Sequence, residues 1–194
     1  MITLFLVRHG AHDLLHKTVV GRAPGIFLNE EGKDQARRAA DRLLYERIEA
    51  IFSSPRERCV QTAQVLSERL GLPVNPVADL DEIEIGRWAG ASFEKMEADP
   101  GWQQYNQNRS LCQAPGGESM LEVQARMVRF VSSLCHQPGL ERVVAFSHGD
   151  PIRAALIYYL GMPIDMFQRL EISPGSVSAL TVGTDFAKVH FLNG

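Results

Sequence analysis

Two apolar stretches of the sequence end in a histidine that is followed by a glycine. The first is TLFLVRHG, residues 3–10, and the second is VVAFSHG, residues 143–149. Short apolar runs that stop at polar residues are typical of buried strands in a parallel sheet. We therefore expect His9 and His148 at the carboxyl ends of two strands, each before a glycine that lets a ligand approach the backbone.

A third apolar run, AIFSS at residues 50–54, brings arginines toward the same place. It leads into Arg56 and Arg58, at the start of a predicted helix that Gly71 is expected to end. Ligands of such sheets bind beyond the carboxyl ends of the strands. We expect these arginines, together with Arg8, to lie near both histidines.

This combination of side chains suits phosphoryl transfer. Arginine offers a fork of donors that matches two phosphate oxygens, and it stays charged at every working pH. A neutral imidazole nitrogen can attack phosphorus, and nearby arginines favour the neutral form while they stabilise the charge of the transition state. An acid for the departing alkoxide is also needed. The stretch DLDEIEIGRWAG, residues 79–90, offers four carboxylates whose spacing does not decide among them: Asp79, Asp81, Glu82 and Glu84.

Predicted helices separate the predicted strands through most of the chain. Asn29 is a candidate cap for a helix with an apolar stripe, and residues 120–137 form a second amphipathic pattern. Segments 177–183 and 187–193 predict a closing hairpin. Alternating strands and helices indicate an α/β fold. We expect one domain over residues 1–194, a three-layer α/β/α sandwich around a mostly parallel sheet.

Composition excludes several classes of partner. The formal net charge of −3 indicates no basic surface for nucleic acid or anionic membranes. Three widely spaced cysteines favour free thiols in a reducing cytoplasm, and we recognise no signal peptide or membrane span. We expect a cytoplasmic protein that binds a small phosphorylated metabolite and neither nucleic acid nor membrane. The sequence leaves open whether the protein forms a homodimer.

Five motifs together resemble the histidine phosphatase superfamily, in its phosphoglycerate-mutase-like branch. They are LVRHG, SSPRERCVQTA, LDEIEIGRWAG, PGGES and FSHGD, in family order from residue 3 to about residue 155. The resemblance implies a mixed sheet with one antiparallel strand and a site that needs no metal or other cofactor. It also implies catalytic roles for five residues: His9 as the nucleophile that becomes phosphohistidine, Arg8 and Arg58 as phosphate clamps, His148 as the second histidine that contacts the phosphate, and Glu82 as the proton donor and later the base.

The sequence departs from this family pattern shortly after the nucleophile. The family commonly has a threonine or serine three residues after it and an asparagine soon after, where this chain has His12 and Leu15. One usual phosphate contact is therefore missing. We expect His12, or Arg22 from VVGRAPG, to replace it as a phosphate- or substrate-binding residue near the mouth of the pocket.

Three functions are compatible with these residues. We favour a metal-independent phosphatase that hydrolyses a small phosphomonoester. The alternative is a phosphoglycerate mutase, an isomerase that returns the phosphoryl group from the same histidine to a carboxylated substrate. Between residues 90 and 115, only Lys95 and Arg109 could pair such a carboxylate. A non-catalytic phospholigand-binding protein is the third hypothesis, although the complete catalytic set argues against it.

Overall fold

The computed structural model describes residues 1–194 and contains one six-stranded sheet. The strands lie in the order β3-β2-β4-β1-β5-β6. β1 pairs in parallel with β4, and β2 pairs in parallel with β4 and β3, whereas β5 is antiparallel to both of its neighbours. β5 is thus the one strand that runs against the other five, which confirms the expected mixed sheet. The strand bounds are β1 (Ile2–Arg8), β2 (Ala50–Ser53), β3 (Val74–Pro76), β4 (Arg142–Ser147), β5 (Val177–Val182) and β6 (Ala187–Phe191).

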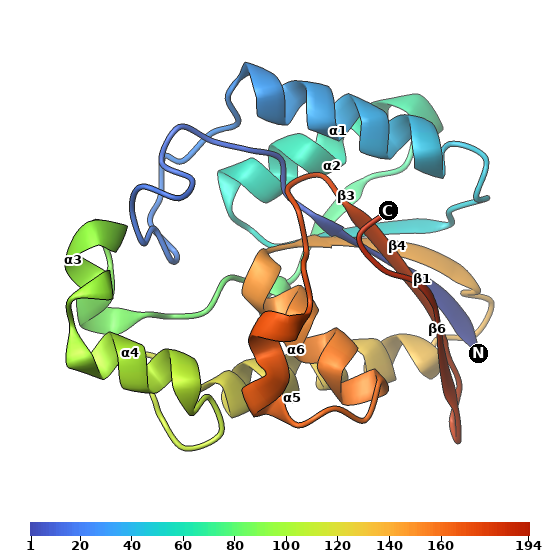
Figure 1. The fold of residues 1–194 in the computed structure, drawn as a ribbon. Helices are drawn as coiled ribbons and strands as arrows, with labels where there is room; N and C mark the ends of the chain where they lie inside the picture. The colour runs from blue at the N-terminus through green and yellow to red at the C-terminus, as the bar shows by residue number, and fades with distance from the viewer.

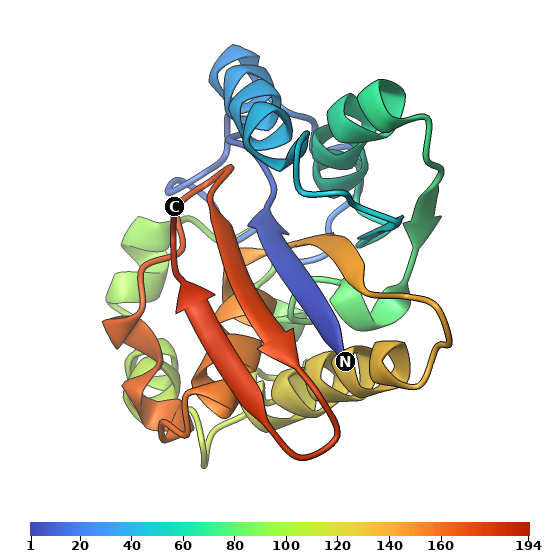
Figure 2. The same cartoon turned by 90° about the vertical axis from the view of Figure 1, so that its right-hand side faces the viewer.

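Helices cover both faces of this sheet. Helices α1 (Glu30–Leu43) and α2 (Glu57–Leu70) pack on one face, and α5 (Met120–Cys135) and α6 (Gly149–Tyr159) pack on the other (Figures 1 and 2). The side chains of β1 alternate between the two layers. Phe5 and Val7 belong to the core between the sheet and helices α1 and α2, whereas Leu4 and Leu6 belong to the core between the sheet and helices α5 and α6. None of the helices is long and apolar enough to cross a membrane.

Local sequence signals explain where these helices begin and end. The side chain of Asn29 accepts a hydrogen bond from the backbone N–H of Gly32 and caps α1. Ser119 and Glu122 form a reciprocal capping box at the start of α5. Gly71, with a φ of 69°, ends α2 in the left-handed conformation. The sequence predicted the roles of Asn29 and Gly71 but not the capping box, and the helices agree with its amphipathic patterns.

The segment between β3 and α5 contains elements that the sequence did not predict. It forms the short helices α3 (Phe93–Glu97) and α4 (Pro100–Gln107), which lie beyond the carboxyl ends of the strands (Figure 1). Three 3-10 turns complete the structure: η1 (Ala78–Leu80), η2 (Gly86–Trp88) and η3 (Ile164–Arg169). Aromatic residues of α4 and its surroundings form a third apolar cluster with α5, α6 and η3. This cluster supports a wall that faces the sheet edge.

The sheet order places three strand ends side by side. β4 lies between β2 and β1, with Arg8 opposite Ser147 and Ser53 opposite Phe146. The strands therefore stop at the same level. This register brings together the residues that follow them, as the sequence predicted.

Candidate active site

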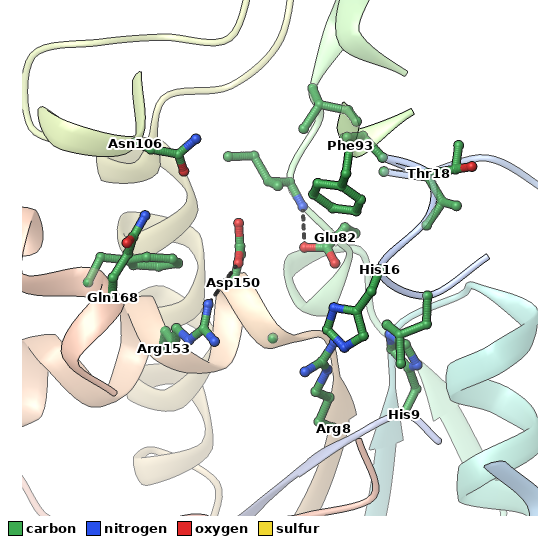
Figure 3. A pocket seen from close by; sticks show the side chains of 18 of the residues that line it. Arg8, His9, His16, Thr18, Glu82, Phe93, Asn106, Asp150, Arg153 and Gln168 are labelled. Atoms are coloured by element: carbon green, nitrogen blue, oxygen red, sulfur yellow. Dashed lines mark hydrogen bonds and ion pairs between the residues drawn. The ribbon is translucent and has the colours of Figure 1, made fainter. Parts of the chain in front are cut away.

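A cavity of about 440 Å³ opens at these strand ends. Its sheet side is formed by Arg8, His9 and Arg58, and His12 and Glu82 also line it. The opposite wall comes from α4, from the first turns of α6 and from η3 (Figure 3). The structure thus brings together most of the residues that the sequence singled out.

His9 is buried immediately after β1, and its ring has one defined orientation. The Nδ1 atom lies 2.8 Å from the carbonyl oxygen of Gly10. A carbonyl can only accept, so Nδ1 carries the proton and donates it. The Nε2 atom therefore holds the lone pair. The backbone N–H of Gly10 in turn donates to Thr62 Oγ1 at 3.1 Å, which anchors the turn to α2.

The surroundings of His9 keep its ring neutral. Burial lowers the pKa of His9 well below its usual value, and the neighbouring cations of Arg58 and Arg8 lower it further. Repulsion from the arginines therefore acts as the sequence suggested, although burial is the larger cause. A neutral imidazole with a free lone pair on Nε2 is a nucleophile at neutral pH.

The two arginines have donors to spare beside this histidine. Arg8 Nη1 donates to the carbonyl oxygen of Ile172 at 2.6 Å, while its Nε has no partner. Arg58 is completely buried, and its Nη2 donates to the carbonyl oxygen of Gly21 at 2.8 Å, while its Nε and Nη1 have no partner. Unsatisfied buried donors on two cations form a site for an anion with several acceptor oxygens.

His148 lies behind these groups and is not among the residues that line the cavity. Its ring packs edge-on against that of His9, with 5.1 Å between the centroids. Arg58 Nη2 donates to His148 Nδ1 at 3.1 Å, and His148 Nε2 lies 2.8 Å from Ser54 Oγ. The structure thus assigns His148 a place among the groups that hold Arg58 and His9. Its expected contact with a phosphoryl oxygen stays a prediction.

The structure distinguishes the four candidate acids. Asp79 and Asp81 are held in ion pairs with arginines, at 2.7 and 2.9 Å, and Glu84 accepts a hydrogen bond from the backbone N–H two residues later. Glu82 alone of the four lines the cavity. Its Oε1 accepts from the backbone N–H of Ile83 at 2.9 Å, and its Oε2 lies 3.6 Å from His148 Nδ1.

Glu82 has the properties of an acid that works near neutral pH. Burial raises its pKa to about 7, and the negative charge of Asp150 contributes to the shift. The carboxyl group is thus protonated in a large fraction of molecules at pH 7. A group with this pKa can both give and take a proton under the same conditions.

Arg22 supports Glu82 from outside the cavity. Its Nε donates to the backbone carbonyl oxygen of Glu82 at 2.7 Å, and its Nη2 donates to Glu118 Oε2 at 2.7 Å. Arg126 makes contacts to the same carbonyl and the same carboxylate. Arg22 does not line the cavity, so the structure places it among the residues that fix the Glu82 loop and not at the mouth of the pocket. Glu118, from the PGGES motif, completes this network.

His12 does lie in the cavity, close to His9. Its ring centroid is 5.5 Å from that of His9, and its Nδ1 is buried without a partner. Burial, with Arg58 and Arg8 nearby, lowers the pKa of His12 to about 4. The ring is therefore neutral at pH 7 and keeps one N–H donor.

The sequence predicted ligand access at the glycines after both histidines, and only Gly149 lines the cavity. A Cβ on Gly10 would lie 2.3 Å from the carbonyl oxygen of Gly32, so this glycine lets α1 approach the turn. A Cβ on Gly149 would meet the Arg8 guanidinium at 3.4 Å. The first glycine thus serves the approach of two backbones and not ligand access, whereas the second lies at the cavity beside Arg8.

Sequence reasoning missed much of the far wall of the cavity. This wall carries Asn106, Asp150, Arg153, Gln168 and Glu171. Asp150 directly follows the Ser-His-Gly motif, which was a usable signal. Asn106, Arg153 and Gln168 belong to helices or a 3-10 turn with no distinctive spacing, and Glu171 lies in the loop after η3. No three His, Cys, Asp or Glu side chains of residues 1–194 are grouped so that they could hold a metal ion.

Comparison with known proteins supplies the family. The family model of the histidine phosphatase superfamily, branch 1, matches residues 4–194. The chain belongs to this superfamily. It is 31% identical to phosphoserine phosphatase 1 of Hydrogenobacter thermophilus over 185 residues, which cover 93% of this chain and 86% of that protein.

The chain is also similar to proteins of this family with other names. A probable phosphoglycerate mutase of Salmonella choleraesuis is 26% identical over 182 residues, covering 93% of this chain and 85% of that protein. The solved structure of mycobacterial glucosyl-3-phosphoglycerate phosphatase in complex with VO3 is 29% identical, with a TM-score of 0.90 over 100% of both chains. This histidine phosphatase is thus a phosphomonoesterase of the phosphoglycerate-mutase-like type.

Proposed function

We propose that this histidine phosphatase hydrolyses a small phosphomonoester through a phosphohistidine formed on Nε2 of His9. The observation that carries this proposal is the orientation of the His9 ring. Its Nδ1 proton is committed to the carbonyl of Gly10, so the lone pair is on Nε2. The low pKa of this histidine keeps that lone pair available at neutral pH.

In the first step, His9 Nε2 attacks phosphorus and the bond from phosphorus to the ester oxygen breaks. Arg8 and Arg58 bind the phosphoryl oxygens with the donors that have no partner in the protein. Glu82 gives its proton to the departing oxygen, so the leaving group is an alcohol and not an alkoxide. His12, neutral and adjacent to His9, donates its N–H to a phosphoryl oxygen in place of the hydroxyl that the family commonly has.

In the second step, water attacks the phosphohistidine. Glu82, now ionised, takes a proton from this water while the bond between phosphorus and Nε2 breaks and returns its electron pair to His9. Orthophosphate leaves, and Glu82 is again protonated. His148 keeps Arg58 and His9 in place through both steps, by its hydrogen bond to Arg58 and its edge-on contact with His9.

Mutase activity is the second candidate, and the relation to the Salmonella protein supports it. A mutase would return the phosphoryl group to a second hydroxyl of the bound acid faster than water reacts. The deciding experiment follows 3-phosphoglycerate with a trace of 2,3-bisphosphoglycerate and measures phosphate release and 2-phosphoglycerate in the same sample. We expect phosphate release to dominate. Rapid interconversion with negligible phosphate release would show an isomerase.

Hydrolysis itself is tested with a panel of phosphomonoesters that includes p-nitrophenyl phosphate. We expect turnover by the purified protein in the presence of a metal chelator, and none by the His9→Ala variant. Inertness of the folded protein toward the whole panel from pH 5 to 8 would instead favour a phospholigand-binding protein.

A further inference from the structure

Two arginines that the proposed mechanism does not use lie on the far wall of the cavity. Arg109 follows α4, and Arg153 belongs to α6. Both guanidinium groups lie against the ring of Phe167, with 4.6 and 5.2 Å from their central carbons to its centroid. Arg109 also lies 4.1 Å from the ring centroid of Tyr105. Aromatic rings therefore pack against both guanidinium groups, which we call the distal arginine pair.

Arg109 is buried, and the protein offers too few hydrogen-bond acceptors for its donors. Its residue is only 5% exposed, and its one hydrogen bond runs from Nη2 to Asn106 Oδ1 at 2.6 Å. The Nε and Nη1 atoms have no partner. The nearest carboxylate oxygen, Oδ2 of Asp150, is 3.7 Å from Nη1, which is too long for a hydrogen bond. Buried donors on a cation are costly to leave unmet, so an acceptor from a ligand would be favourable here.

The charges of this wall do not balance. Asp150 lies between the two arginines, because its Oδ2 is 3.7 Å from Arg109 Nη1 and its Oδ1 is 3.6 Å from Arg153 Nη1. Its single negative charge compensates one of their two positive charges. Glu171 is 3.9 Å from Arg153, but its side chain is 70% exposed and water screens it. About one positive charge is left for a ligand group to neutralise. A hydroxyl would satisfy donors but would leave this charge.

We propose that the distal arginine pair binds a carboxylate on the alcohol part of the substrate, so that the enzyme selects phosphorylated acids over phosphorylated neutral alcohols. A carboxylate is planar and presents two oxygens to the edges of guanidinium groups. The inference rests on the proposed function, because the phosphoryl end of the same molecule must face His9. In Figure 3, Arg153 and Asp150 lie across the cavity from Arg8 and His9, as two ends of one binding site require.

The first test compares four substrates in two pairs. 3-Phosphoglycerate and phosphoserine carry a carboxylate, whereas glycerol 3-phosphate and phosphoethanolamine do not. We expect kcat/KM to be about 10- to 100-fold higher for the carboxylated pair, which is the range for a charged hydrogen-bonded contact. Equal values for both pairs would overturn the inference. A preference for phosphoethanolamine would also overturn it, because Asp150 would then be recognising an ammonium group.

Substitutions test which residues carry the preference. Arg109→Met keeps much of the apolar bulk between the two rings, and Arg153→Met removes the more accessible cation of the pair. We expect either variant to lower the ratio of kcat/KM between carboxylated and other substrates at least tenfold, through KM more than kcat. Arg129→Met, an exposed arginine outside the cavity, is the matched control and should keep the wild-type ratio. Unchanged ratios in folded Arg109 and Arg153 variants would contradict the assignment.

A binding measurement separates this inference from the proposed function. Calorimetry would compare 3-phosphonopropionate with propylphosphonate, which lacks the carboxylate and cannot be hydrolysed either. We expect at least tenfold tighter binding of the first, and tighter binding still in Asp150→Asn, because a competing carboxylate is removed. Equal affinities would overturn the inference even if hydrolysis is confirmed. If no phosphomonoester is hydrolysed but this difference appears, the proposed function fails while the carboxylate subsite stands.

Discussion

Replacing Glu82 with glutamine should divide phosphomonoesters by their leaving groups. An alkyl phosphate departs as a strongly basic alkoxide unless it is protonated, whereas nitrophenolate leaves readily without a proton. Glutamine has nearly the shape of glutamic acid but cannot transfer the proton. We expect kcat/KM for an alkyl phosphate to fall by about 10²- to 10⁴-fold, and for p-nitrophenyl phosphate by less than about tenfold.

The same substitution should stabilise the folded protein at alkaline pH. Burial raises the pKa of Glu82 from 4.5 to about 7. As pH rises between these values, the unfolded chain loses this proton and the folded protein keeps it, so the free energy of unfolding falls. Above pH 7 the loss amounts to about 3 kcal/mol, since the shift from 4.5 to about 7 is worth about 1.4 kcal/mol per unit. Glutamine carries no charge and avoids this loss.

Urea unfolding and steady-state kinetics at pH 5 and pH 8 measure both effects. Glu84→Gln is the matched control, because Glu84 lies on the same loop and does not line the cavity. We expect Glu82→Gln to be more stable than the wild type at pH 8, with most of this gain absent at pH 5. Equal losses of activity on both substrates would mean that another group is the acid. An equal change in stability at both pH values would refute the raised pKa.

Three other predictions concern the remaining buried groups. His12→Phe should lower kcat/KM at least tenfold, whereas His12→Asn should lower it less because asparagine keeps a hydrogen-bond donor. Equal losses of kcat/KM in the two variants would show that His12 only fills space. The low pKa of His9 should leave no acid limb near pH 6.5 in kcat/KM, whereas the pKa of Glu82 near 7 should produce an alkaline limb for alkyl substrates. An acid limb at pH 6.5 that persists in the His12→Asn and Glu82→Gln variants, assayed with p-nitrophenyl phosphate, would contradict the low pKa of His9. Burial raises the pKa of the Cys59 thiol, so iodoacetamide at pH 8 should modify Cys59 only after unfolding, as peptide mass mapping would show.

Sequence reasoning located the site because parallel strands impose a common edge. An apolar run followed by a polar residue marks a strand end, and neighbouring ends lie at one level once the sheet order is fixed. Arg8, His9, Arg58 and His148 were therefore placed together without any coordinates. Choosing Glu82 among four carboxylates needed the family resemblance, since the loop that carries it has no regular periodicity. The structure agrees, because the other three carboxylates have partners elsewhere.

There is a physical reason why the sequence did not predict the far wall of the cavity. Helices α3 and α4 have 5 and 8 residues, too few for an amphipathic pattern to stand out, and their stability comes from packing in the third apolar cluster. The sequence offered Arg22, like His12, as a substitute phosphate contact near the pocket mouth, but its loop contains glycine and proline and gives no direction for its side chain. Its partners, Glu118 and the carbonyl of Glu82, are distant in sequence. Only tertiary structure shows that Arg22 supports the acid from behind.

Trapping the covalent intermediate tests the central claim most directly. Wild-type protein would be mixed with a radioactively labelled phosphomonoester, quenched in alkali within milliseconds, digested and mapped by mass spectrometry. We predict an alkali-stable, acid-labile phosphoryl group on His9, which forms and decays at rates compatible with turnover. An active preparation in which His9 carries no label, or in which another residue carries it, would contradict the mechanism.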